Sequence, residues 1–276
     1  MSRLLILTSF LTLCACSDST TATPGDNPDA APDSGTDATS AMQDASTETG
    51  TFPFRINFNN GLTGEGIEGA EVCIVEPEMI EDPCSTTDSG GLITRTWENP
   101  QFGNLLSRFT LDGYVTTIYP GHFNEDVRDV WDALVTLNGS VEGQYFAFTE
   151  GQADAYSSTG GVTRTAGKGV VIYRVVDSDG NGVAGASVTL ENAAGDSVGT
   201  VVYQSGTSII LDSSLTSTSG SGFVMIANVD PGDYTMRITH ERAQCTALNS
   251  YFIDTANVVP VPVQADTLTS GLLLCE

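Results

Sequence analysis

Basic residues are scarce in this chain of 276 residues, which has 10 Lys and Arg against 35 Asp and Glu and a formal net charge of −25. Binding of nucleic acid needs clustered Lys and Arg to neutralise phosphates, so the composition excludes a nucleic-acid partner. The same charge would repel anionic lipid headgroups. We interpret it as a property that keeps the surface soluble, not as a ligand site.

Histidines and catalytic motifs are also missing. The only two histidines are His122 and His240, which limits metal and acid–base chemistry. The sequence has no His-Glu-x-x-His, no Gly-x-Ser-x-Gly and no phosphate-binding glycine loop. Nothing in the pattern supplies a base for a Ser or Cys nucleophile. The sequence therefore predicts a non-enzymatic protein with no catalytic residues, no metal and no cofactor.

The first residues have the pattern of an export signal. Arg3 precedes an apolar run over residues 4–13, which is too short to span a bilayer and has the length of a signal core. The run ends in LCAC (residues 13–16), which resembles the lipobox of bacterial lipoproteins. This resemblance implies a signal peptide over residues 1–15 and lipidation of Cys16 by acyl chains such as palmitate. Ser17 at the next position favours sorting to the outer membrane or cell surface.

Residues 16–50 differ in composition from the rest of the chain. They are rich in Ser, Thr, Asp, Ala and Pro and contain no Lys or Arg. Such a segment cannot bury enough apolar surface to offset its ordering entropy. We expect a disordered acidic stalk that holds the folded part away from the lipid surface.

Two segments after the stalk share one pattern. GIEGAEVCI (residues 66–74) matches GVAGASVTL (residues 182–190), and TDSGGLI (87–93) matches TSGSGFV (218–224). In each pair a glycine-rich turn leads into a strand with apolar residues at alternate positions, which predicts one buried face. The spacing is longer in the second copy, which indicates a loop insertion around residues 199–215.

The second copy resembles a known family. DSDGNG (177–182), the Gly-Ala-x-Val step, the Ser/Gly turn and PGDY (231–234) are similar to the carboxypeptidase regulatory-like, or transthyretin-like, domain. The first copy lacks Pro-Gly-x-Tyr and has DGY (112–114) instead. The resemblance implies an all-β fold of two tandem Ig-like sandwiches over residues 51–140 and 168–276, in modules that are mostly non-catalytic.

Residues 141–167 are predicted to link the two modules, with a short helix around residues 152–156. Just before them, residues 125–137 could form a short helix. We expect a strand that closes the first sandwich at their end, because residues 133–137 meet Asn138-Gly139, a turn signal.

Four cysteines remain after Cys16 is set aside. An even number in an exported chain indicates disulfides, with three connectivities. Because each close pair lies within one proposed module, we predict Cys73–Cys84 and Cys245–Cys275. Neither pair has the spacing of a zinc or thioredoxin motif.

Two further features admit a functional interpretation. Asp177 and Asp179 begin like a calcium loop, but Val188 stands where an acidic ligand belongs, so a turn explains them better. Five aromatic residues would suit a sugar-stacking platform if they were exposed, although isolated aromatics in strands usually pack in the core: Trp97, Tyr114, Tyr119, Trp131 and Tyr173.

Together these features favour a non-enzymatic envelope lipoprotein that displays two β-sandwich modules for binding, adhesion or scaffolding. The first alternative is a carbohydrate-binding surface lipoprotein, and the second is an unrecognised hydrolase. Fold analogy does not choose among these roles. The predicted partners are a membrane, through the lipid, and a protein or polysaccharide.

Overall fold

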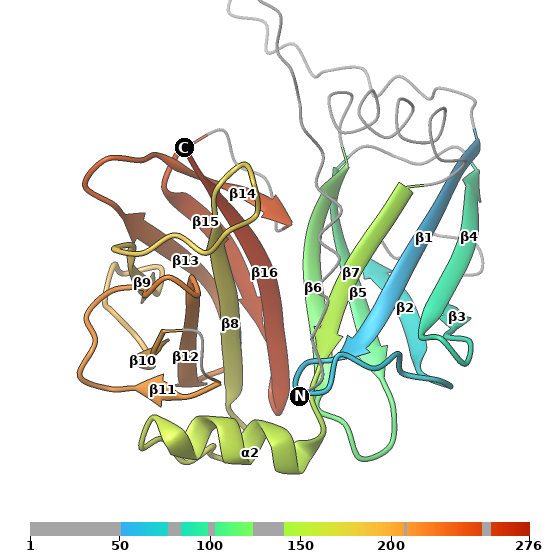
Figure 1. Ribbon diagram of the computed structural model, residues 1–276, viewed down its shortest axis with the longest axis horizontal. Helices are drawn as coiled ribbons and strands as arrows, with labels where there is room; N and C mark the ends of the chain where they lie inside the picture. Colours follow the sequence, from blue (N-terminus) through green and yellow to red (C-terminus); the bar gives the residue numbers. More distant parts are fainter. Residues whose placement is uncertain (1–50, 77–83, 99–102, 124–140, 207–208, 250–254) are drawn as a thin grey trace, which may run out of the picture.

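The computed structural model describes residues 51–76, 84–98, 103–123, 141–206, 209–249 and 255–276. These residues form three β-sheets and one α-helix (Figure 1). The protein is therefore all-β, as the sequence predicts. No helix among the described residues has the length and apolar character needed to cross a membrane. The signal peptide, Cys16 and the stalk lie outside the described residues, as does the strand expected over residues 133–137.

Seven of the described strands lie in the first half. Strand β1 is the centre of a three-stranded sheet, antiparallel to β4 and parallel to β7, and the remaining strands pair in the order β6-β5-β2-β3. The strands are β1 (Thr51–Asn60), β2 (Glu71–Glu76), β3 (Cys84–Thr86), β4 (Leu92–Glu98), β5 (Gly103–Thr110), β6 (Thr116–Phe123) and β7 (Val141–Ala147).

The second half repeats this topology. Strand β8 pairs antiparallel with β12 and parallel with β16, and a separate sheet has the order β15-β13-β9. The strands are β8 (Gly169–Val176), β9 (Ser187–Glu191), β10 (Thr200–Gln204), β11 (Leu211–Asp212), β12 (Phe223–Val229), β13 (Gly232–Thr239), β14 (Cys245–Asn249), β15 (Val258–Val263) and β16 (Thr267–Cys275).

The repeated sequence pattern corresponds to one repeated hydrogen-bonded junction. In the first half, Thr87 accepts from Gly69 N through its carbonyl and from Ala70 N through its hydroxyl, and its own N–H donates to Ala70 O. Thr218 makes the same three bonds with Gly185 and Ala186.

The glycines of this junction are fixed by close backbone approach. A Cβ on Gly66 would lie 2.0 Å from Gly90 O, and one on Gly182 would lie 2.4 Å from Gly220 O. A side chain at either position would collide with backbone, which explains why the glycine recurs at both sites.

The insertion predicted around residues 199–215 is not a simple loop. It forms β10 and β11, which extend the sheet beyond β12. The sequence interpretation missed these strands because a tolerated insertion carries no signal that its residues will find a pairing edge.

The two halves share one sheet. Strand β16 pairs in parallel with β6, which joins both halves into a ten-stranded sheet (Figure 1). Thr117 and Thr269 are fully buried at this seam, and their hydroxyls donate to Val115 O and Pro262 O. Buried polar groups that are paired in this way avoid the cost of desolvation.

Three apolar clusters fill the layers. One lies between the sheets of the second half and includes Tyr173, Leu190 and Met236. Another fills the first half around Phe58 and Phe109. The third lies on the outer face of the second half's part of the large sheet, and it brings helix α2 (Glu150–Thr159) against residues such as Val170, Met225 and Leu268. Because α2 covers this face, β8 is buried along nearly its whole length.

The predicted domain boundaries, 51–140, 141–167 and 168–276, stay a prediction. Strand β7 pairs with β1 over Phe54–Val141 to Asn60–Ala147, so residues 141–147 belong to the first half's sheet. The helix expected around residues 152–156 is present and longer, with a capping box at its start between Thr149 and Gln152.

Candidate functional site

The described cysteines form two disulfides, Cys73–Cys84 and Cys245–Cys275, which confirms the predicted pairing. The first bridge ties β3 to β2 at one end of the large sheet. The second ties β14 to β16 and is buried. Glu71 lies within 4.8 Å of Cys73 and Cys84, but both sulfurs are bonded to each other, so this group offers a metal only one carboxylate.

The two repeats cover the outer edges of the corresponding strands β2 and β9 in different ways. In the first half, β3 pairs with the outer edge of β2. In the second half the hydroxyl of Tyr203 accepts from Val188 N at 2.9 Å and donates to Val188 O, so a side chain satisfies the edge of β9. Burial raises the pKa of Tyr203 above its ordinary value.

The acidic turn at Asp177 is held together by its own hydrogen bonds. Asp177 Oδ1 accepts from the backbone N–H groups of Asp179 and Asn181, and Oδ2 accepts from the Asn181 side chain. Both carboxylate oxygens are therefore engaged in the turn. Calcium binding by Asp177 and Asp179 stays a prediction.

The sugar-stacking hypothesis is wrong for two of its five aromatic residues. Tyr119 and Tyr173 are buried in the cores. The Tyr119 hydroxyl donates to Phe146 O, and burial, together with the nearby Tyr145, raises its pKa. Tyr114 is half-buried against the first core. The Trp97 side chain and Trp131 lie outside what the structure describes. Alternation in a strand does not reveal that both faces of a sheet are covered.

A shallow polar groove of about 640 Å³ lies at one end of the second half. It is lined by Ser187, Thr216, Thr239, His240 and Arg242, among others. His240 Nδ1 accepts from Arg242 N, and Nε2 lies 3.2 Å from Ala184 O. Both ring nitrogens face backbone groups, so His240 has no hydroxyl or thiol to activate in this arrangement. His122 lies on β6.

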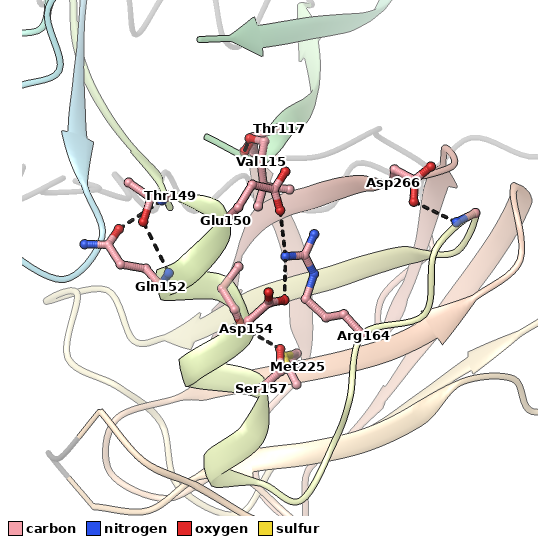
Figure 2. Close-up of polar contacts among 12 residues, drawn as sticks. Val115, Thr117, Thr149, Glu150, Gln152, Asp154, Ser157, Arg164, Met225 and Asp266 are labelled. Carbon is pink, nitrogen blue, oxygen red and sulfur yellow. Dashed lines mark hydrogen bonds and ion pairs between the residues drawn. The ribbon is translucent and has the colours of Figure 1, made fainter. Parts of the chain in front are cut away.

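Polar side chains also converge at the start of α2, where Figure 2 shows Thr149 bonded to Gln152. Gln152 Oε1 accepts from Asn60 and from Thr149 N, and Gln152 Nε2 donates to Asn60 Oδ1. Asn60 Oδ1 also accepts from Leu62 N and Thr63 N. We call this contact the Asn60–Gln152 joint. It fixes the end of β1 against the start of α2.

Figure 2 also shows Arg164 between two acidic residues of α2. Its Nη1 lies 2.9 Å from Glu150 and 3.0 Å from Asp154, and its side chain is only 17% exposed. Elsewhere in this region Asp266 accepts from Gly167 N. These contacts hold the segment between α2 and β8 in place.

A second contact between the halves lies beside the seam. Arg108 of β5 donates to Gln264, which precedes β16. The residues that join the halves were not predicted from the sequence. The capping-box spacing of Thr149 and Gln152 is a signal that could have located the helix start, but it does not indicate a contact with β1.

No protein-family model matches the chain, and no curated protein matches it. Among solved structures it is similar to the TIE protein of Bacillus anthracis, with 14% identity and a TM-score of 0.27 over 82% of this chain and 34% of that one. It is also similar to BcpA, the major pilin subunit of Bacillus cereus, with 11% identity and a TM-score of 0.28 over 82% of this chain and 99% of that one.

A third similar structure is GBS52, the minor pilin of Streptococcus agalactiae, with 12% identity, a TM-score of 0.28 and coverage of 81% and 95%. The chain spans about a third of the TIE protein and 62% of the streptococcal ancillary pilin. Similarity at this level leaves the functional argument to the geometry of the chain itself.

Proposed function

We propose that the chain is an exported, non-enzymatic lipoprotein of the bacterial envelope whose two β-sandwich repeats form one rigid scaffold for a binding partner. The observation that carries this proposal is the β6–β16 seam, which makes a single sheet from both halves. The Asn60–Gln152 joint and the Arg108–Gln264 contact also hold the two halves together. Three contacts far apart in sequence restrain the halves more than a free linker would.

The proposed localisation rests on the sequence. Cys16 follows a signal-like run and would carry the acyl chains, and two or more chains anchor a protein stably. The two disulfides suit an oxidising compartment outside the cytoplasm. The finer assignments to the outer membrane and to the carboxypeptidase regulatory-like family belong to the same proposal.

The anchor can be tested with a matched pair of cysteine variants. We expect the full chain, expressed in a bacterium and labelled with a palmitate analogue, to fractionate with membranes. Cys16→Ala should abolish labelling and prevent cleavage at this site, whereas Cys14→Ala, two residues away, should leave both unchanged. Intact mass and N-terminal sequencing report the cleavage site. A mature chain that begins at any residue other than 16 would contradict the anchor.

A further inference from the structure

The two repeats differ in the segment that follows the matching strands β2 and β9. In the second half, the segment after β9 forms β10 and β11, and β10 pairs antiparallel with β12. In the first half, the shorter segment after β2 forms β3, which stays on β2 and is tied there by Cys73–Cys84. Among the described residues, β4, the counterpart of β12, pairs only with β1.

The backbone groups on the outer edge of β4 can be identified from the register. Phe58 N donates to Gly91 O, so the pair Phe58–Gly91 is a hydrogen-bonded pair of the β1–β4 ladder. Because such pairs alternate in an antiparallel ladder, Ile93 also faces β1, whereas Thr94 and Thr96 direct their N–H and C=O groups away from it.

The matching positions in the second half are occupied. Counting from the glycines Gly91 and Gly222, Thr94 corresponds to Met225 and Thr96 to Ala227. Met225 and Ala227 face Val202 and Thr200 of β10. The molecule therefore shows which kind of segment fits this edge: a short antiparallel strand.

Four other sheet edges among the described residues carry features that discourage pairing. Strand β15 has prolines at positions 260 and 262, β3 has three residues, β11 has two, and Tyr203 satisfies Val188 on β9. Strand β4 is seven residues long and contains neither Pro nor Lys. We confine the inference to β4, because its counterpart β12 shows which strand pairs with the matching edge.

We propose that the outer edge of β4 binds an extended segment of a partner protein as an added antiparallel strand. The inference rests on the proposed scaffold function and names the surface through which it acts. Ile93 is buried in the first core and Thr94 is exposed, so the partner segment alternates apolar and polar residues. The net charge of −25 opposes a second copy of this chain, so the segment is neutral or basic.

The first test is hydrogen exchange on the purified mature chain. An unpaired amide exchanges far faster than one in a ladder. We expect the amides of Thr94 and Thr96 to exchange at least about a hundredfold faster than those of Met225 and Ala227. Equal protection at the two sets of positions would show that the β4 edge is already covered, and would overturn the proposal.

The second test uses a peptide with the sequence of residues 199–205, which pairs with the matching edge in the second half, carrying Val202→Lys. This position faces Met225, the counterpart of exposed Thr94, so the lysine lies on the solvent side. We expect the peptide to bind the mature chain and to slow exchange at Thr94 and Thr96. Failure to bind at millimolar concentration overturns the proposal.

A matched pair of variants locates the binding edge. Thr94→Pro with Thr96→Pro removes the two outward N–H groups and should weaken peptide binding at least about tenfold, because each lost ladder bond reduces affinity. Thr94→Val with Thr96→Val keeps these groups and should bind normally. Thermal unfolding verifies that both variants fold. Unchanged affinity of the proline variant overturns the proposal, whereas the lipidation experiment reports on Cys16 independently.

Discussion

The phenolic oxygen of Tyr203 lies 2.9 Å from the backbone nitrogen of Val188, on a neighbouring sheet. One hydroxyl thus performs the role that strand β3 performs in the first half. Removing it in Tyr203→Phe leaves Val188 N without its partner, which should cost about 1–3 kcal/mol in the free energy of unfolding. Urea denaturation would measure this loss.

The control for this change is Tyr234→Phe. The Tyr234 hydroxyl donates to Asp230 O at an exposed site, where water can replace it. We expect a much smaller loss of stability than for Tyr203→Phe. Equal losses for the two variants would mean that the Val188 edge is satisfied by another group.

The two disulfides should differ in their contribution to stability. Their sequence separations are 30 for Cys245–Cys275 and 11 for Cys73–Cys84. The chain-entropy model gives about 3.6 kcal/mol for the longer loop and about 2.8 kcal/mol for the shorter. Replacing each pair by two alanines and comparing urea midpoints tests this order. The opposite order would show that strain or packing, and not loop length, determines the difference.

The Asn60–Gln152 joint should be sensitive to small chemical changes at Gln152. Gln152→Ala leaves Thr149 N without its partner and leaves the Asn60 amide with only its longer bond to the Tyr114 hydroxyl, which should cost about 1–3 kcal/mol. Gln152→Glu keeps an acceptor for both donors and loses only the bond to Asn60 Oδ1. We therefore expect an intermediate loss. Calorimetry would reveal whether the halves still unfold in one transition; a glutamate variant less stable than the alanine variant would contradict this account of the joint.

Alkaline pH should destabilise the fold through its buried tyrosines, among them Tyr119 and Tyr156. Burial raises the pKa of Tyr119, with a further contribution from Tyr145, and burial raises the pKa of Tyr156. In the unfolded chain both groups lose their protons near pH 10. Their contribution to stability is thus complete below pH 10 and declines above it, by about 1.4 kcal/mol per pH unit per tyrosine. Unfolding followed across this range tests the slope, with Tyr156→Phe as the control that reduces it.

Calcium should not change the melting temperature if Asp177 serves only its turn. Both of its carboxylate oxygens are already hydrogen-bonded within residues 177–181. Asp177→Ala should then destabilise the protein equally with and without calcium, because the turn loses the same bonds. A calcium-dependent rise in melting temperature that disappears in Asp177→Ala would instead establish a metal site.

Local patterns in the sequence predict the local structure well. The glycine spacing around Gly66 and Gly182 corresponds to the same junction in both halves, and the cysteine pairs form as expected. What could not be predicted are contacts between distant edges. The pairing of Thr116 with Thr267 has no sequence signal, because either strand could have remained an exposed edge.

Burial on a second face was equally hidden. Ile172 lies on the face of β8 that α2 covers and is buried there, whereas the neighbouring Tyr173 is buried in the core between the sheets. A hydrophobic residue in such a strand looks the same in sequence whether or not a helix will cover it. The outer edge of β4, which has no partner strand in the described part of the chain, became visible only by comparison with β12, and this comparison requires the pairing of both strands.

Strand β16 has a consequence for when the molecule can fold. It pairs with β8, β6 and β14, yet it follows all three of them in the chain order. The large sheet therefore cannot close until residues 267–275 have left the ribosome, and such distant pairings form slowly. In the exported protein that we propose, this delay would allow the chain to pass through a translocation pore before it folds.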